Sequence, residues 1–316
     1  MACDWIKVRA PGSVMLFGEH AVLTGKPAMV AAIDQYITVT LEKRADDIIE
    51  INSNTFSPYT THLKELTIAK PYNFVLACLI QQHQKITQGL TIRIASTIDP
   101  NLGLGSSAAI TVALLSALDT LFQIKMDVWR NAREAIRDVQ GRGSGMDALA
   151  SLHGGVLYYT PRTEKALALA PRSDLHLFYS GYKTPTATVL QRVQESFKGS
   201  ESILDSIYDA IGKTVELACH AWQRDDIALL AHCMEIHQGL QHALQVSDAH
   251  TDRLRHWLRE RVAVEAVKIS GSGLGDCLLA LGGKWQEISN EEITALHPKA
   301  RYMPLTINTT GVSLVQ

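Results

Sequence analysis

The amino-acid sequence predicts an α+β protein built from two domains. Its 316 residues suit one large domain or two of ordinary size and are enough to bury a substantial core. Segments typical of strands dominate the N-terminal half, whereas one long helical tract dominates the C-terminal half. Because the pattern changes near residue 165, we expect an N-terminal domain over residues 1–165 and a C-terminal domain over residues 166–316.

The N-terminal half is expected to form a mainly antiparallel or mixed sheet with helices packed on it. Short apolar or alternating runs predict strands at 14–17, 36–42, 90–95 and 155–159. Longer runs without glycine or proline predict helices at 73–84, 108–122 and 131–139. Between the last of these helices and the last strand, the sequence predicts a glycine-rich turn.

The C-terminal half is expected to place two or three helices against a second sheet. Its helical tract covers residues 202–261 and is interrupted at Asp225 and Ser247, two residue types that commonly cap helix N termini. Strands are expected at 176–180, 267–269 and 277–281, and the last two flank a glycine-rich loop.

A loop rich in glycine and serine precedes the predicted helix at 108–122. Its residues are Gly103, Leu104, Gly105, Ser106, Ser107, Ala108 and Ala109. Glycines let a ligand approach the backbone, and the free N–H groups and dipole of a helix N terminus favour negative charge. The Walker pattern is absent, because no lysine follows the second glycine. The loop predicts a phosphate-binding site, although a plain capped helix start would have a similar composition.

Two further segments place this loop in a wider pattern. Residues 10–23 read APGSVMLFGEHAVL, and residues 268–277 read KISGSGLGDC. With the central loop they resemble, in order and position, the three motifs of the superfamily of galactokinase, homoserine kinase, mevalonate kinase and phosphomevalonate kinase. This resemblance to the GHMP kinases extends over nearly the whole chain.

The resemblance implies a fold and a co-substrate. The N-terminal domain should resemble the second domain of ribosomal protein S5, the C-terminal domain should be a ferredoxin-like α/β plait, and the active site should lie in the cleft between them. ATP is the implied co-substrate, with Mg²⁺ to neutralise charge on the phosphates. The implied nucleotide-binding residues are Gly103, Leu104, Gly105, Ser106, Ser107, Ala108, Gly271, Ser272 and Gly273. For the last three, a turn that only joins two strands would have the same composition.

The resemblance also implies a metal site at Ser107. A hydroxyl and a carboxylate are ligands that suit Mg²⁺. The matching carboxylate is Asp138, which precedes residues 139–142 as a glutamate does in archaeal mevalonate kinases. Glu134 on the same helix is an alternative ligand, and a solvated Asp138 without a metal role is another interpretation.

Asp147 is the implied catalytic residue. It ends the segment 144–147, SGMD, which resembles the family's S-G-x-D segment, whose aspartate faces the substrate hydroxyl. An aspartate in a glycine turn commonly forms only an Asx turn, but its place between the central loop and the strand at 155–159 matches that of the family's base. A normal carboxylate would suffice for phosphoryl transfer through a loose transition state.

Four residues are the implied contacts of the acceptor substrate: Glu19, His20, Lys183 and Thr188. The first two resemble the substrate-contacting pair of mevalonate kinase, although their side chains could simply hydrogen-bond each other. The other two lie in a segment that resembles a cleft segment with a basic residue and a substrate-binding threonine. Thr186 is the alternative threonine.

Ser13 departs from the family pattern, which has a lysine at this position of the first motif. In mevalonate kinases that lysine lies near the catalytic aspartate and can lower its pKa or help to activate the hydroxyl. We expect Arg9 or Lys7 to supply the missing charge if either side chain enters the cleft.

The expected reaction is ATP-dependent phosphorylation of the 5-hydroxyl of mevalonate, a step of isoprenoid precursor biosynthesis. Residues 18–20, GEH, favour mevalonate, whereas segments 32–40, 143–150 and 275–277 look more like phosphomevalonate kinase. Phosphomevalonate kinase is therefore the alternative. The serine in place of the motif lysine leaves a non-catalytic nucleotide- or metabolite-binding relative as a third interpretation.

Charge and composition fit an enzyme of small molecules. A formal net charge of -2 gives no general attraction to nucleic acid or to an anionic membrane. The five cysteines form no C-x-x-C pair, so neither a disulfide framework nor a structural zinc site is indicated. No signal peptide or membrane span is predicted. We expect a cytoplasmic protein that binds ATP and a small acceptor, without nucleic-acid or membrane partners, and the sequence leaves a homodimer open.

Overall fold

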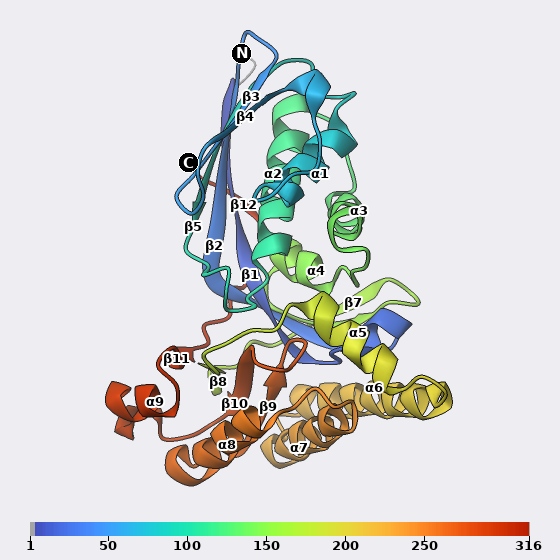
Figure 1. Ribbon diagram of the computed structural model, residues 1–316, viewed down its shortest axis with the longest axis vertical. Coiled ribbons are helices and arrows are strands. Elements are labelled where there is room, and N and C mark those ends of the chain that lie inside the picture. The colour runs from blue at the N-terminus through green and yellow to red at the C-terminus, as the bar shows by residue number, and fades with distance from the viewer. Residues whose placement is uncertain (1–3, 316) are drawn as a thin grey trace.

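Two sheets form the framework of the protein, and Figure 1 shows helices packed on one face of each in the computed structural model. The structure describes residues 4–315. No helix within that range is long and apolar enough to cross a bilayer.

Within the described residues, the first sheet is mixed and has eight strands. Its strands are β1 (Trp5–Phe17), β2 (Ala28–Lys43), β3 (Ile48–Ser53), β4 (Tyr59–His62), β5 (Leu90–Ser96), β6 (Val156–Thr160), β7 (Lys165–Leu169) and β12 (Ser313–Leu314). The order is β12–β1–β2–β5–β3–β4, with β6 paired to β2 and β7 paired to β6. The pair β3–β5 is parallel and the other pairs are antiparallel, in agreement with the predicted mixed sheet.

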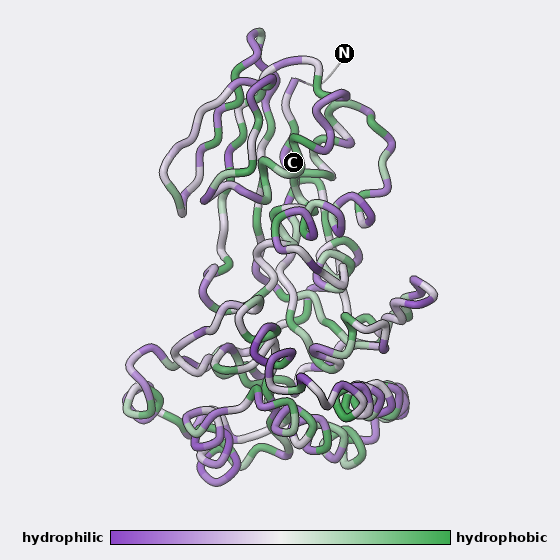
Figure 2. The backbone as a smooth tube through the Cα atoms, turned by 45° about the vertical axis from the view of Figure 1, so that its right-hand side comes forward, coloured by the Kyte–Doolittle hydropathy of each residue, from purple (hydrophilic) through white to green (hydrophobic). Residues whose placement is uncertain are grey.

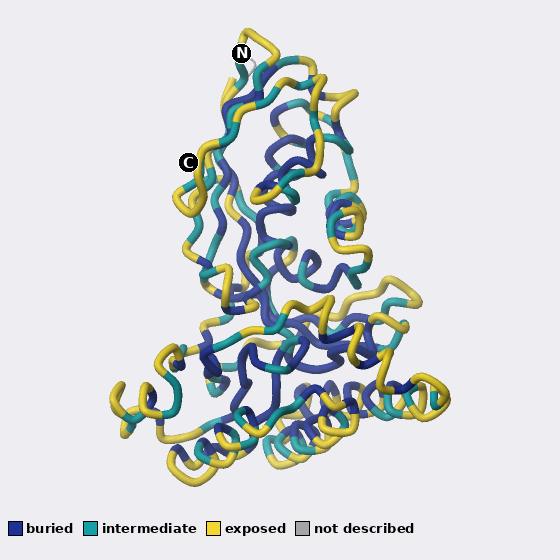
Figure 3. Tube along the Cα trace, in the orientation of Figure 1, coloured by how far each residue is buried: buried dark blue, intermediate teal, exposed yellow. Residues whose placement is uncertain are grey.

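Four helices cover this sheet: α1 (Asn73–Gln82), α2 (Ser106–Phe122), α3 (Val128–Gln140) and α4 (Met146–His153). Helix α2 packs against β1 and β2 on one side and against α1, α3 and α4 on the others. Because it is the central helix, it is apolar around nearly its whole circumference, as the Ala- and Leu-rich sequence suggests. Figure 3 shows buried residues along the strands and the inner helices, and Figure 2 shows hydrophobic residues in the same elements.

The second sheet is antiparallel in the order β11–β8–β10–β9. Its strands are β8 (Leu175–Tyr179), β9 (Ala266–Ser270), β10 (Cys277–Leu281) and β11 (Arg301–Pro304). The helices of this half are α5 (Thr186–Ser196), α6 (Glu201–Gln223), α7 (Ile227–Ala243), α8 (Ala249–Trp257) and α9 (Asn290–Leu296). The four strands with packed helices agree with the ferredoxin-like arrangement that the resemblance implies.

Two predicted helix starts were wrong by one residue. Helix α7 is capped by Asp226, whose carboxylate accepts the Leu229 N–H, and α8 is capped by Asp248, which accepts the Thr251 N–H. Asp225 instead has φ of 55° and ends the preceding turn. Where two neighbouring residues can each cap a helix, the sequence does not reveal which of them forms the cap.

The end of the chain returns to the first sheet. After β11, Ile307 bridges to Ile33, and β12 pairs with β1 at Val8 and Arg9. Strand β7 also belongs to the first sheet. Because β12 joins the first sheet after the last strand of the second, the two sheets are not separated by a single point in the sequence. The three sequence motifs lie where β1, α2 and the β9–β10 loop come together.

Candidate active site

A cleft of about 260 Å³ brings the three sequence motifs together. Its walls come from the end of β1, the loop before α2, the segment 140–147, the loop before α5 and the loop between β9 and β10. The predicted residues that line it are Glu19, His20, Gly103, Gly105, Ser106, Ser107, Asp147, Lys183, Gly271 and Ser272. Segments more than 250 residues apart in sequence, such as those of Glu19 and Ser272, therefore share one cavity.

The glycine loop packs closely against residues from both halves of the molecule. A Cβ atom at Gly105, which has φ of 68°, would collide with the Ser13 side chain. A Cβ atom at Gly103, with φ of 73°, would lie 2.9 Å from Asp276 Oδ1 and 3.2 Å from Lys183 Nζ. Glycine is required at both positions, because the loop has left-handed backbone and no space for side chains. The loop leads directly into α2, whose N terminus carries no side-chain cap and so leaves its N–H groups available to an anion.

Ser13 contacts the predicted base directly. The β1–β2 pairing is irregular between Pro11 and Ser13, and the Ser13 N–H donates to Leu104 O at 3.1 Å. An irregularity of this kind redirects a side chain. The Ser13 hydroxyl then donates to Asp147 Oδ1 at 2.7 Å. At the sequence position where the resemblance implies a lysine, this chain therefore has a neutral hydrogen-bond donor.

Asp147 lies in the first turn of α4, which begins inside the segment predicted as a turn. Burial raises the pKa of its carboxyl group, while the Ser13 hydrogen bond and the charge of Lys183 act in the opposite direction. The raised pKa brings the carboxyl closer to the range of a general base at neutral pH.

A second carboxylate, Asp276, reaches the cleft from the β9–β10 loop. Lys183 Nζ lies 3.6 Å from Asp276 Oδ1, and the Ser272 hydroxyl donates to Asp276 Oδ2 at 3.3 Å. Burial raises the pKa of Asp276, opposed mainly by Lys183. Sequence reasoning missed Asp276, and its constrained backbone, with φ of 63°, is visible only in the structure.

Glu19 lines the cleft and contacts residues of the second half of the molecule. The Lys268 ammonium donates to Glu19 Oε1 at 2.6 Å, and both side chains are almost fully buried. Burial acts to raise the pKa of Glu19, but the charge of Lys268 and the proximity of His237 leave it below its ordinary value. Burial lowers the pKa of His237 to about 4, so this ring is neutral at pH 7 and accepts the Gly18 N–H at 3.0 Å. Neither Lys268 nor His237 could be recognised from sequence, since only the fold brings them to Glu19.

His20 lines the cleft, and one of its two ring nitrogens is buried without a hydrogen-bond partner within residues 4–315. Burial lowers the pKa of His20, so the ring is neutral at pH 7, and Nε2 donates to Ser272 O at 2.8 Å. Nδ1 is then the unprotonated nitrogen, and it has no hydrogen-bond partner among residues 4–315. A hydroxyl group of a ligand could donate to it.

Several predicted residues lie elsewhere. Asp138 is exposed on α3 and does not line the cleft, and the Glu134 carboxylate accepts a hydrogen bond from Gln81 on α1. Thr186 lines the cleft, whereas Thr188 is exposed outside it. The remaining predicted nucleotide contacts that do not line the cleft are Leu104, Ala108 and Gly273.

Neither proposed source of the missing charge enters the cleft. The Arg9 guanidinium packs 4.6 Å from the centre of the Tyr36 ring and donates to Ser313 Oγ. Lys7 is likewise absent from the lining. The cations that do line the cleft are Lys183 and Arg142.

The donor set fits Mg²⁺ held mainly by a nucleotide. Within the described range, no cluster of three or more His, Cys, Asp or Glu side chains could hold a metal. The Ser107 side chain lines the cleft at the start of α2, beside the glycine loop. Mg²⁺ commonly takes only one or two protein ligands and completes its shell with phosphate oxygens and water.

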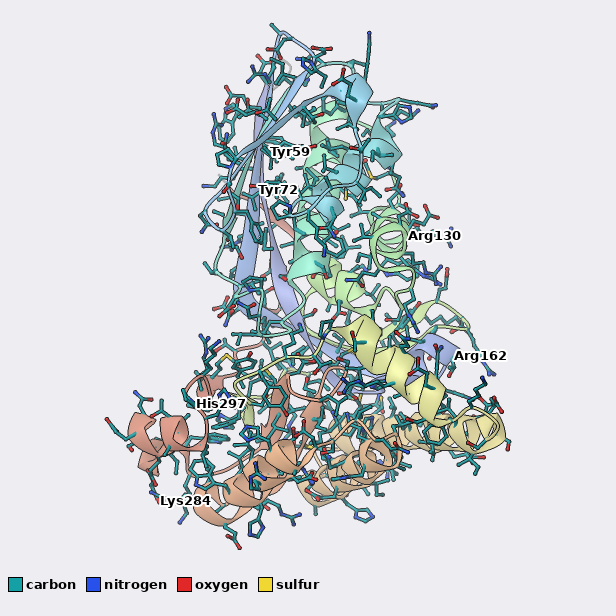
Figure 4. All side chains as sticks on the ribbon, in the orientation of Figure 1. Tyr59, Tyr72, Arg130, Arg162, Lys284 and His297 are labelled. Carbon is teal, nitrogen blue, oxygen red and sulfur yellow. The ribbon has the colours of Figure 1, made fainter. Side chains whose placement is uncertain are left out.

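Two further cavities adjoin the cleft. An apolar pocket of about 260 Å³ shares Ser106 and Ser107 with it and is walled by Phe56, Tyr72 and Phe74. Figure 4 shows Tyr72 beside Tyr59 in the first half of the molecule. On the other side, a groove of about 1100 Å³ shares His20 and Arg142 with the cleft. Its lining arginines are Arg133, Arg137, Arg142 and Arg162.

Comparisons with known proteins agree with this geometry. Residues 71–155 match the GHMP kinases N terminal domain, residues 215–292 match the GHMP kinases C terminal domain, and residues 4–43 match the galactokinase galactose-binding signature. The chain belongs to the GHMP kinase family. It is therefore an ATP-dependent kinase that acts on an alcohol.

Individual members of the GHMP kinase family show how far the likeness extends. The mevalonate kinase of Methanothermobacter thermautotrophicus is 31% identical over 86% of this chain and 88% of its own. The mevalonate kinase structure from Methanococcus jannaschii superposes with a TM-score of 0.74 at 22% identity, covering 98% of both chains. The Lactococcus lactis galactokinase complexed with galactose gives a TM-score of 0.82 at 16% identity, covering 99% of this chain and 96% of its own. The fold is shared across these kinases, so it does not select the acceptor.

Proposed function

We propose that this GHMP kinase transfers the γ-phosphoryl group of ATP to the 5-hydroxyl of mevalonate. The observation that carries the proposal is the cleft itself. Asp147, the phosphate loop and His20, whose Nδ1 has no partner within the described residues, all line this one cavity. Relatives that are about 30% identical over most of the chain and are named mevalonate kinases support the choice of acceptor.

In the proposed complex, ATP extends from the apolar pocket into the cleft. The purine base would pack between Phe56, Tyr72 and Phe74, because a flat apolar group suits an aromatic pocket that opens onto the phosphate loop. The phosphates would lie on the loop at Gly103 and on the N terminus of α2. Ser107 would hold Mg²⁺ together with phosphate oxygens and water, and Mg²⁺ supplies neutralisation of the charge on the transferring group.

The acceptor would enter from the arginine-lined groove. Arg142 lines both cavities and makes no ion pair or hydrogen bond with another residue in the described range. In contrast, Arg133 donates to Glu164 Oε1 at 2.9 Å. A free guanidinium beside the cleft suits a carboxylate, since both groups are planar and can pair through two hydrogen bonds. A hydroxy acid such as mevalonate has this carboxylate and an alcohol at a distance from it.

Asp147 would accept the proton of the acceptor hydroxyl. The hydroxyl oxygen forms the new bond to the γ-phosphorus, the bond from that phosphorus to the bridging oxygen breaks, and ADP leaves with the electron pair. His20 Nδ1 would accept a hydrogen bond from a second hydroxyl of the substrate and so fix its orientation.

ADP release with purified protein tests the proposal, using mevalonate, 5-phosphomevalonate and galactose as separate acceptors. We expect the highest kcat/KM with mevalonate. Turnover of 5-phosphomevalonate or galactose alone would assign the other acceptor. Binding of ATP without turnover of any acceptor would favour the non-catalytic relative.

The same assay, applied to the variant Arg142→Gln, tests whether Arg142 binds the acceptor. This variant should raise the KM for mevalonate about tenfold or more with little change in the KM for ATP, since it removes a charged contact to the acceptor alone. Arg130→Gln is the matched control, because Arg130 lies on α3 outside the cleft (Figure 4) and pairs with Glu164 at 3.1 Å. Equal KM values for the two variants would remove Arg142 from acceptor binding.

A further inference from the structure

Ser13 gives Asp147 a neutral hydrogen-bond donor at the position where the family resemblance implies a lysine. Ser13 is almost fully buried, and its side chain fills the space between Gly105 and Asp147. The hydroxyl supplies a hydrogen bond but no charge. Any positive charge near Asp147 has to come from another wall of the cleft.

Lys183 lies in such a wall. It lies in the loop between β8 and α5, in the second half of the molecule, and lines the cleft together with Asp147. Its ammonium approaches the phosphate loop closely, as the 3.2 Å to a Cβ built on Gly103 shows. Arg142, the other cation of the lining, also faces the outer groove. Lys183 therefore lines the same cleft as Asp147 and carries its charge beside the phosphate loop.

Asp276 fixes the position of Lys183. Its Oδ1 lies 3.6 Å from Lys183 Nζ, and it has no hydrogen-bond partner among the described residues. The carboxylate is buried and held from its other oxygen by the Ser272 hydroxyl. The Asp276 N–H also donates to Tyr182 O at 2.9 Å, which ties the two loops together next to Lys183. A long side chain restrained in this way loses less freedom when it acts on a ligand or a neighbour.

We propose that Lys183, positioned by Asp276, takes over the role of the absent motif lysine: its ammonium supplies positive charge to the cleft that Asp147 lines and faces the phosphates above Gly103. Both residues come from loops that follow or join strands of the second sheet, so the charge comes from the second half of the molecule. The inference rests on the proposed role of Asp147 as base. Lys183 and Asp276 are positioning residues in this scheme, since they act through Asp147 and the loop.

Steady-state kinetics of Lys183→Met, Lys183→Arg and Asp276→Asn test the inference with the acceptor that the wild type turns over. We expect Lys183→Met to lower kcat about a hundredfold, Asp276→Asn about tenfold, and Lys183→Arg to recover most of the loss, because the charge is what matters. Asp276→Asn should add nothing in the Lys183→Met background, since the two residues act as one unit. Lys284→Met, an exposed change outside the cleft (Figure 4), is the matched control.

A readout without turnover separates this inference from the proposed function. Asp147 faces the hydroxyl of Ser13 on β1 and the ammonium of Lys183, while the other titratable groups that line the cleft are Glu19, His20, Arg142 and Asp276. NMR titration of the Asp147 carboxyl, assigned with Asp147→Asn, should show a higher pKa in Lys183→Met than in the wild type. A protein that turns over no acceptor but shows this shift would refute the function and keep the charge coupling.

Three results would overturn the inference. One is an unchanged Asp147 titration in Lys183→Met. Another is a Lys183→Met enzyme whose kcat stays within twofold of wild type while only the acceptor KM rises, because Lys183 would then bind the acceptor alone. The third is an Asp276→Asn effect of the same size with and without Lys183.

Discussion

At Asp147, burial shifts the pKa of the carboxyl group in one direction and two neighbouring residues shift it in the other. Loss of water raises the pKa of the carboxyl group above the 3.8 of an ordinary aspartate, while the Ser13 hydroxyl and the Lys183 charge limit the rise. The base works only when ionised, so kcat should fall as the pH drops through this raised pKa. The acid limb of the kcat profile should therefore lie above the range of an exposed aspartate.

Asp147→Asn should lower kcat about a hundredfold or more and leave nucleotide affinity nearly unchanged, because the side chain keeps its shape and loses only its basicity. The acid limb of the pH profile should disappear with it. Measurement of kcat against pH, together with the Kd for ATP, checks both points. A variant with near wild-type kcat would exclude Asp147 from the chemistry.

Single residues show which of the predicted site residues local motifs bring to the cleft and which they do not. Asp147 and Ser107 lie in local motifs, and the structure brings both to the cleft. Asp138 was chosen for its place beside a motif, but on α3 it is exposed outside the cleft. Lys268 pairs with Glu19 across about 250 positions of sequence and His237 lies beside it across about 220, and no local pattern marks such neighbours.

At the scale of elements, the start of α2 connects the glycine loop to the nucleotide. Ser106 and Ser107 are consecutive and both line the cleft and the apolar pocket, so they form a matched pair. If Ser107 holds Mg²⁺, Ser107→Ala should raise the Mg²⁺ concentration needed for half-maximal turnover several-fold, whereas Ser106→Ala should change it little, because water replaces a lost oxygen ligand imperfectly. Titration of turnover with Mg²⁺ at saturating ATP measures the difference. Equal, small effects would mean that the loop binds phosphate through its backbone alone.

The longer elements could be predicted and the shorter ones could not. Alternation and glycine-free runs indicated β2, β5, α1, α2 and α3, although β1 and β2 are longer than expected because they pair along most of their length. The polar strand β4 has four residues and the exposed strand β7 has five, and neither has an apolar alternation strong enough to mark it. Helix α4 was mistaken for a turn, since it begins at two glycines and one of them, Gly145, is its cap.

At the scale of the whole molecule, the first motif fastens the two halves together. Strand β1 pairs within the first sheet, yet the Ser270 hydroxyl of β9 donates to Met15 O at 2.7 Å. Two residues past the end of β1, Glu19 pairs with Lys268 of β9. The boundary predicted near residue 165 stays a prediction, because β12 returns to β1 after the second sheet is complete.

The buried pair Glu19–Lys268 should therefore contribute to the stability of the whole fold. Glu19→Gln leaves a buried ammonium without its counter-charge, which typically costs about 3–5 kcal/mol. Combined Glu19→Gln and Lys268→Met should cost less than the sum of the single changes, because the double variant leaves no unpaired charge. Glu42→Gln is the surface control: Glu42 pairs with Arg93 at 2.9 Å, but both side chains are about half exposed, and such pairs contribute about 1 kcal/mol or less.

The pH dependence of this stability has a definite sign. Because the folded pKa of Glu19 is below its ordinary 4.5, its contribution is present above pH 4.5 and is lost as the pH falls through the lower folded value. Denaturant unfolding of wild type and variants at neutral and acid pH measures this. The gap between wild type and Glu19→Gln should narrow in acid, where protonation of Glu19 makes the two side chains equivalent. A gap that stays constant down to pH 3 would mean that packing, rather than the ion pair, carries the effect.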